Sequence, residues 1–111
     1  MELIETSIFS KRIATLLSDE EYGEFQFRIA AHPEAGAVIR GSGGIRKIRV
    51  AVGSRGKSGG ARVIYCWAVR KDLILLLYAY AKNRVADLTP KQVLQLAKVV
   101  KEEFGSETTD V

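Results

Sequence analysis

The sequence has 111 residues, of which 47% are hydrophobic and 27% are charged, and its net charge is +4. This length suits one domain whose core needs neither disulfides nor a metal, so we predict a single domain over residues 1–104 and a flexible tail at residues 105–111. No run approaches the roughly 20 apolar residues of a membrane span. Residues 1–5 carry acids where a secretion signal carries bases, so we expect a cytoplasmic protein with no membrane contact.

The first third of the chain predicts a strand followed by a helical hairpin. β-branched and apolar residues over residues 2–9 indicate the strand. Helical spacing of apolar residues then indicates a helix over residues 10–17. Ser18 and Glu21 match the capping-box pattern that begins a second helix, and Pro33 ends it.

A glycine-rich turn precedes three further strands, which we predict over residues 45–52, 61–69 and 73–81. Alternation in the first of them places Lys47 and Arg49 on one face and apolar residues on the other. The other two strands are apolar on both faces, which indicates central strands that helices cover on at least part of one side. Consecutive strands of this kind form an antiparallel meander.

The last predicted element is a helix that Thr89 and Pro90 begin, with Gln92 completing a second capping box. It continues to Phe104, and Gly105 ends it. The predicted fold class is therefore α+β: a strand, two helices, a three-stranded antiparallel meander and a C-terminal helix.

Positive charge is concentrated in the middle of the chain. Between Glu34 and Asp72 there are nine lysines or arginines and no acid. Such a block favours a polyanionic partner, either nucleic acid or an acidic protein segment, although a solvated surface without a partner would also account for it. We expect the working surface to combine the basic strand face with the following glycine-rich loop, and its members are Lys47, Arg49, Arg55, Lys57 and Arg62.

The few histidine and cysteine residues in the sequence exclude several enzyme classes. The one histidine, His32, stands at a predicted helix end, where a capping role is expected, and it cannot supply a two-histidine ribonuclease mechanism. Cys66 lies in an apolar run, which favours burial over reactivity. Metal-ligand spacing is absent from the sequence, so we predict no metal and no cofactor.

Two tyrosines of the last predicted strand have alternative roles. Alternation would place Tyr78 and Tyr80 on the same strand face as Ile74 and Leu76. Core packing is the ordinary role for such residues, but the tyrosine nearer the strand end could reach an RNA base or transfer a proton.

Three segments together resemble the RelE/HigB toxin superfamily of type II toxin-antitoxin systems. They are residues 47–50 (KIRV), 60–65 (GARVIY) and 80–84 (YAKNR). Residues 17–22 (LSDEEY) and 43–50 (GGIRKIRV) are similar to the HigB branch in particular. The resemblance implies a ribosome-dependent mRNA endoribonuclease that inhibits translation by cutting mRNA in the A site of the 70S ribosome. It also implies a cognate HigA/RelB-like antitoxin.

The resemblance also implies roles for individual residues. Lys47 and Arg49 match the family's paired basic strand residues, and Arg62 matches its phosphate-binding arginine. Lys82 matches a basic residue after the last long strand, whereas Asn83 stands where RelE has an arginine. The C-terminal tyrosine that transfers a proton in RelE has no counterpart, which leaves the acid and the base open among Tyr80, Lys57 and Lys82. We expect RNA contacts from Lys47, Arg49, Arg55 and Asn83, and catalytic roles for Arg62, Lys82, Lys57 and Tyr80.

Two other functions remain open on the sequence. A ParE-like toxin would use the same scaffold without catalysis, to bind a protein such as DNA gyrase. A plain RNA-binding module would need only the basic loops.

Overall fold

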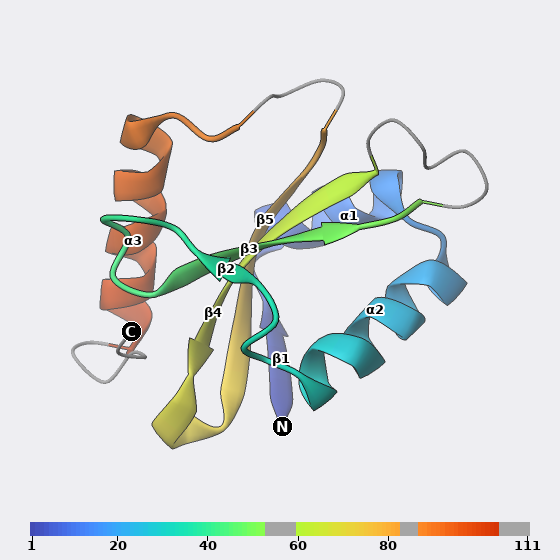
Figure 1. Cartoon of the computed structure of the whole chain (residues 1–111), viewed down its shortest axis with the longest axis horizontal. Coiled ribbons are helices and arrows are strands. Elements are labelled where there is room, and N and C mark those ends of the chain that lie inside the picture. Colours follow the sequence, from blue (N-terminus) through green and yellow to red (C-terminus); the bar gives the residue numbers. More distant parts are fainter. Residues whose placement is uncertain (53–59, 83–86, 105–111) are drawn as a thin grey trace.

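A mixed sheet of five strands organises the chain in the computed structural model, which describes residues 1–52, 60–82 and 87–104 (Figure 1). The elements are β1 Glu2–Glu5, α1 Ser7–Leu16, α2 Asp19–Ala31, β2 Ala37–Val38, β3 Ile45–Val50, β4 Ala61–Ala68, β5 Leu73–Ala81 and α3 Pro90–Phe104. The strands lie in the order β1-β5-β4-β3-β2, with β1 parallel to β5 and the other neighbours antiparallel. The predicted α+β fold class is confirmed.

The N-terminal strand is shorter than the sequence predicts, because a helix begins where the strand is expected to continue. β1 ends at Glu5, and the Thr6 side chain accepts a hydrogen bond from the N–H of Phe9 at 3.1 Å. Threonine is a good N-cap, so residues 7–9 form the first turn of α1, and Phe9 enters the core. The prediction of a strand over residues 2–9 is therefore wrong beyond Glu5.

The second helix has the boundaries that the sequence predicts. The Ser18 side chain accepts a hydrogen bond from the N–H of Glu21 at 3.0 Å, and the Glu21 side chain accepts one from the N–H of Ser18 at 2.8 Å. An N-cap of this kind stabilises a helix by about 1 kcal/mol. The helix ends at Ala31, and His32 forms its C-terminal cap. The expected capping position of the histidine is confirmed.

β3, β4 and β5 form the predicted antiparallel meander, and the structure adds a strand that the sequence does not indicate. β2 pairs with β3 through Ala37 and Val38 alone, which are too few residues for an alternating pattern. Tyr65 of β4 anchors the segment before β2. Its hydroxyl accepts a hydrogen bond from the N–H of Gly36 and donates one to the carbonyl of Pro33, both at 2.8 Å.

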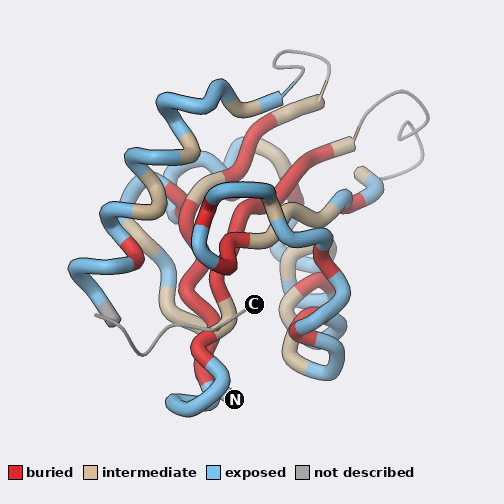
Figure 2. The backbone as a smooth tube through the Cα atoms, turned by 60° about the vertical axis from the view of Figure 1, so that its left-hand side comes forward, coloured by how far each residue is buried: buried red, intermediate tan, exposed pale blue. Residues whose placement is uncertain are grey.

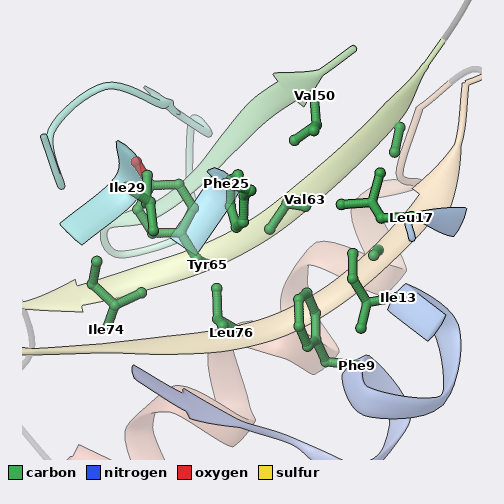
Figure 3. Close-up of a cluster of buried hydrophobic side chains, with 12 residues drawn as sticks. Phe9, Ile13, Leu17, Phe25, Ile29, Val50, Val63, Tyr65, Ile74 and Leu76 are labelled. Carbon is green, nitrogen blue, oxygen red and sulfur yellow. The ribbon is translucent and has the colours of Figure 1, made fainter. Parts of the chain in front are cut away.

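Each face of the sheet has its own hydrophobic cluster, and Figure 2 shows the buried backbone concentrated in the strands. α1 and α2 cover one face, with Phe9, Ile13, Phe25 and Ile29 inside the cluster shown in Figure 3. α3 covers the other face, where Val100 is buried. β4 and β5 contribute to both clusters, which explains why their sequences are apolar at successive positions.

A bulge in β5 changes the face that its last side chains occupy. The register with β4 shifts between Ile64 and Tyr65, so that Leu77 of β5 is an extra residue. Side chains beyond the bulge therefore alternate in the opposite phase. Tyr80, with Tyr78 beside it, packs in the cluster beneath α3, whereas the residues two and four positions before Tyr78 pack beneath α1 and α2. The prediction that all of these residues share one face is wrong.

α3 begins with the predicted capping pair. Thr89 and Gln92 exchange hydrogen bonds of 2.8 and 3.1 Å between side chains and backbone N–H groups. Val100 is buried, whereas Val99 beside it is 39% exposed. In the part of the chain that the structure describes, no helix combines the length and apolar character needed to cross a membrane.

Candidate functional site

A row of side chains crosses the sheet on the face that α3 covers. Arg49 of β3 lies directly opposite Arg62 of β4, and Arg62 lies directly opposite Tyr80 of β5. Directly opposite residues of antiparallel strands project from the same face, so these side chains are neighbours. Lys47 stands two residues before Arg49 and shares its face. We call Lys47, Arg49, Arg62 and Tyr80 the cross-strand row.

The cross-strand row passes from exposed to buried side chains. Arg49 is exposed, and the Lys47 side chain is 31% exposed. Arg62 is only 8% exposed, and Tyr80 is fully buried. A buried side chain samples few rotamers, so the Arg62 guanidinium is held in place while the outer cations can adjust to a ligand. The row therefore offers one fixed positive charge and two accessible ones.

The Tyr80 hydroxyl is the polar group at the buried end of this row. It is enclosed, and among the described residues it has no hydrogen-bond partner in bonding geometry. Burial raises the pKa of Tyr80, the nearby Asp87 carboxylate raises it further, and the positive charge of Arg62 opposes both effects. The hydroxyl consequently stays protonated at neutral pH and can donate a hydrogen bond.

Asp87 is a member of the site that sequence reasoning missed. Its Oδ1 lies 3.0 Å from Lys47 Nζ and accepts a second hydrogen bond from the N–H of Leu88 at 2.9 Å. These hydrogen bonds, with the charges of Lys47 and Lys82, hold the pKa of Asp87 below its usual range. The sequence offers no signal for this contact, because Asp87 stands 40 residues from Lys47 in an ordinary helix lead-in.

Lys82 directly follows β5, at the end of the sheet where the row lies. Its N–H donates to the carbonyl of Gly60 at 3.1 Å, which joins the ends of β4 and β5. Gly60 has φ +64°, and a Cβ at this position would lie 2.5 Å from the carbonyl oxygen of Val50. The junction beside the cross-strand row therefore requires glycine.

Three predicted site residues lie outside the described residues. Arg55 and Lys57 belong to residues 53–59, which connect β3 to β4, and Asn83 belongs to residues 83–86, which follow β5. Among the described residues, Val50 lies opposite Ala61, and Ala61 lies opposite Ala81.

Part of the basic block has a structural role away from the row. Arg46 Nη1 donates to the carbonyls of Glu34 and Gly36 at 3.0 and 2.7 Å, which supports the connection between α2 and β2. Arg70 and Lys71 lie in the turn between β4 and β5, at the other end of these strands. The charge count alone therefore overstates the size of the site.

The chemistry available to the row is that of anion binding. Guanidinium and ammonium groups form short, charge-assisted hydrogen bonds to phosphate oxygens. Held in place, they also stabilise negative charge that develops during a reaction. Within residues 1–52, 60–82 and 87–104, no group of three or more His, Cys, Asp or Glu side chains is placed to hold a metal ion.

A comparison with known protein families identifies a toxin family. The model of the family described as the RelE toxin of the RelE/RelB toxin-antitoxin system matches residues 27–110 of the 111. The matched region contains β3, β4, β5 and α3, and therefore the whole cross-strand row and Asp87.

Proposed function

The chain belongs to the RelE family of toxins from toxin-antitoxin systems, and we propose that it is a cytoplasmic, ribosome-dependent mRNA endoribonuclease of the HigB branch. The observation that carries this proposal is the position of Arg49 directly opposite Arg62, with Lys47 on the same face. Like charges directly opposite each other destabilise a sheet, so a polyanion that bridges them accounts for the arrangement. An mRNA backbone supplies such a chain of phosphates.

The proposed reaction is attack of an RNA 2′-hydroxyl on the adjacent phosphorus. The bond between O2′ and phosphorus forms and the bond between phosphorus and O5′ breaks, which gives a 2′,3′-cyclic phosphate and a 5′-hydroxyl. One proton leaves O2′ and one reaches O5′. Arg62 and Arg49 neutralise the extra negative charge of the pentavalent phosphorane, and Lys47 orients the strand. This scheme requires no metal ion and no cofactor.

The proton transfers fall to a small set of side chains. Tyr80 is one candidate for the proton donor to O5′, because it lies in the row beside Arg62. Lys57 and Lys82 are the candidates for the other transfer. Arg55 and Asn83, which lie outside the described residues, are the further RNA contacts of this proposal.

The direct test is to express the chain alone in cells and map the 5′ ends of a translated reporter mRNA. We expect cuts that follow the reading frame. Arg62→Ala should lose them, whereas Arg70→Ala, which makes the same change at an exposed position outside the row, should keep them. Urea unfolding of both purified variants would verify that they fold.

Other results would point to other functions. Growth arrest with intact mRNA and accumulated DNA breaks would contradict the proposal and favour a ParE-like inhibitor of gyrase. Binding to programmed ribosomes without cleavage would favour a plain RNA-binding module.

The proposed partners follow from the same row. The 70S ribosome presents mRNA in its A site, and a HigA/RelB-like antitoxin inhibits the toxin. An acidic segment of the antitoxin would complement the exposed cations Lys47 and Arg49. Loss of antitoxin binding in a Lys47→Glu, Arg49→Glu double variant would support this contact.

A further inference from the structure

We propose that a pocket beside the cross-strand row binds one nucleobase of the RNA, and that Asp87 determines which base it accepts. This inference rests on the proposed ribonuclease function. The pocket has a volume of about 300 Å³ and lies between β2, β3 and the residues that lead into α3. Because this volume is at the lower end of the range for small-molecule sites, the pocket suits one planar base and not a longer segment.

The pocket has apolar side chains on two sides, with charged residues between them. Ile39 contributes from the β2 side, and Leu88 and Val93 contribute from the α3 side. Apolar side chains on two sides of a pocket can pack against the two faces of a flat ring.

Lys47 joins the pocket to the phosphate-binding row. It lines the pocket and it also belongs to the cross-strand row. A phosphate held by Lys47 is connected to its base through a single sugar, so the base lies within reach of the pocket. The pocket is therefore placed for a nucleotide next to the phosphates that the arginines hold.

The edge of β2 adds hydrogen-bonding groups to the pocket wall. Ala37 lies opposite Lys47, and the N–H of Ile39 donates to the carbonyl of Ile45 at 2.8 Å. Val38 stands between these two positions, so its N–H and carbonyl point away from β3. One backbone donor and one acceptor thus face outward where Val38 lines the pocket.

Asp87 supplies the group that distinguishes between bases. An ionised carboxylate only accepts hydrogen bonds. Guanine presents two adjacent donors on its pairing edge, a ring N–H and an amino group, which a carboxylate attracts. Uracil presents one donor between two carbonyls, which a carboxylate repels. Arg40, which also lines the pocket, can donate to the guanine carbonyl. We therefore expect a preference for guanine and a rejection of uracil.

The test compares the bases around the cut sites for the wild-type chain and Asp87→Asn. Both are expressed in cells, and the 5′ ends of all translated mRNAs are sequenced. We expect the wild type to favour guanine over uracil at one position beside the cut. Asp87→Asn should reduce this ratio about tenfold, because an amide donates as well as accepts. The ratio is read independently of the total amount of cleavage.

A second variant tests the pocket itself. Val93→Phe places a ring in the space that the base would occupy, whereas Val99→Phe makes the same change on an exposed part of the same helix. We expect Val93→Phe to lower cleavage at guanine sites about tenfold relative to Val99→Phe. Urea unfolding of both proteins checks that neither substitution disrupts the fold.

The outcomes separate this inference from the proposed function. If wild type, Asp87→Asn and Val93→Phe cleave with the same base preference, the proposal of a nucleobase pocket is wrong. The proposed ribonuclease function is unaffected by that result. If the wild type does not cleave mRNA, the proposed ribonuclease function is wrong. If Val93→Phe kept normal cleavage but lost antitoxin binding, the pocket would be a protein-docking site and the nucleobase proposal would be wrong.

Discussion

The hydroxyl oxygen of Tyr65 lies 2.8 Å from the backbone nitrogen of Gly36 and links the centre of the sheet to the segment before β2. The fit is close, since a Cβ on Gly36 would lie 2.8 Å from the same oxygen. Tyr80 has an equally buried ring, but its hydroxyl has no partner in bonding geometry among the residues that the structure describes. The two tyrosines therefore differ in what their hydroxyls contribute.

Removing these two hydroxyls should have opposite effects on stability. Tyr65→Phe leaves the buried N–H of Gly36 without an acceptor, and we expect it to lower the free energy of unfolding by about 1–3 kcal/mol. Tyr80→Phe removes a buried hydroxyl that has no hydrogen-bond partner among the described residues, so stability should stay the same or rise by about 1 kcal/mol, while mRNA cleavage falls. Urea unfolding and 5′-end mapping measure the two effects. Equal destabilisation by both substitutions would show that the Tyr80 hydroxyl has a partner.

We expect Arg49 to strengthen RNA binding but to lower the free energy of unfolding. Because Arg49 faces Arg62 across the strand pair, Arg49→Gln should relieve repulsion and raise the free energy of unfolding by about 0.5 kcal/mol. The same substitution should weaken RNA binding and reduce cleavage. Arg70→Gln, outside the row, serves as the control for both measurements. A loss of stability in Arg49→Gln would contradict the repulsion argument.

Two glycine substitutions should change stability in opposite directions. Gly60→Ala forces a Cβ into a left-handed conformation and against the Val50 carbonyl, and we expect a loss of about 2 kcal/mol or more. Gly23→Ala lies in α2, where a Cβ meets no atom within 4 Å, so helix propensity should raise stability by about 0.5–1 kcal/mol. Thermal unfolding of the two variants makes the comparison, and a stabilising Gly60→Ala would refute the close approach of β3 and β4 at this point.

The ion pair between Lys47 and Asp87 should make stability depend on acidity. The hydrogen bond from Lys47, followed by that from the Leu88 N–H, lowers the pKa of Asp87 from its usual 3.8. A lowered carboxyl pKa stabilises the fold above the unfolded-state pKa, and this contribution disappears as the pH falls through the folded-state pKa. The advantage of wild type over Asp87→Asn should therefore shrink as the pH falls below about 5.

Urea unfolding of the two proteins across this pH range checks the prediction. The effect should be small and should weaken further in high salt, because the Asp87 side chain is 61% exposed. A constant difference between the two proteins at every pH would mean that the ion pair does not contribute to stability.

Local patterns in the sequence predict most of the helices and strands. The capping boxes at Ser18 and Thr89 locate the starts of α2 and α3, because their hydrogen bonds join residues only three positions apart. Alternation around Lys47 and Arg49 assigns the basic face of β3 for the same reason. The N-terminal strand is misjudged at Thr6, where the cap competes with β-branched neighbours and tertiary packing of Phe9 favours the helix.

The sequence by itself determined the α+β class, the order of the central elements and the side chains available to bind an anion, since all of these depend on composition and short-range periodicity. Only the tertiary structure decided which of these side chains meet. The register places Arg49 opposite Arg62, and the bulge at Leu77 turns Tyr80 toward them. The tertiary structure also places Asp87, which precedes α3, within hydrogen-bonding distance of Lys47. These relationships join residues far apart in the chain, and packing of the whole sheet selects them.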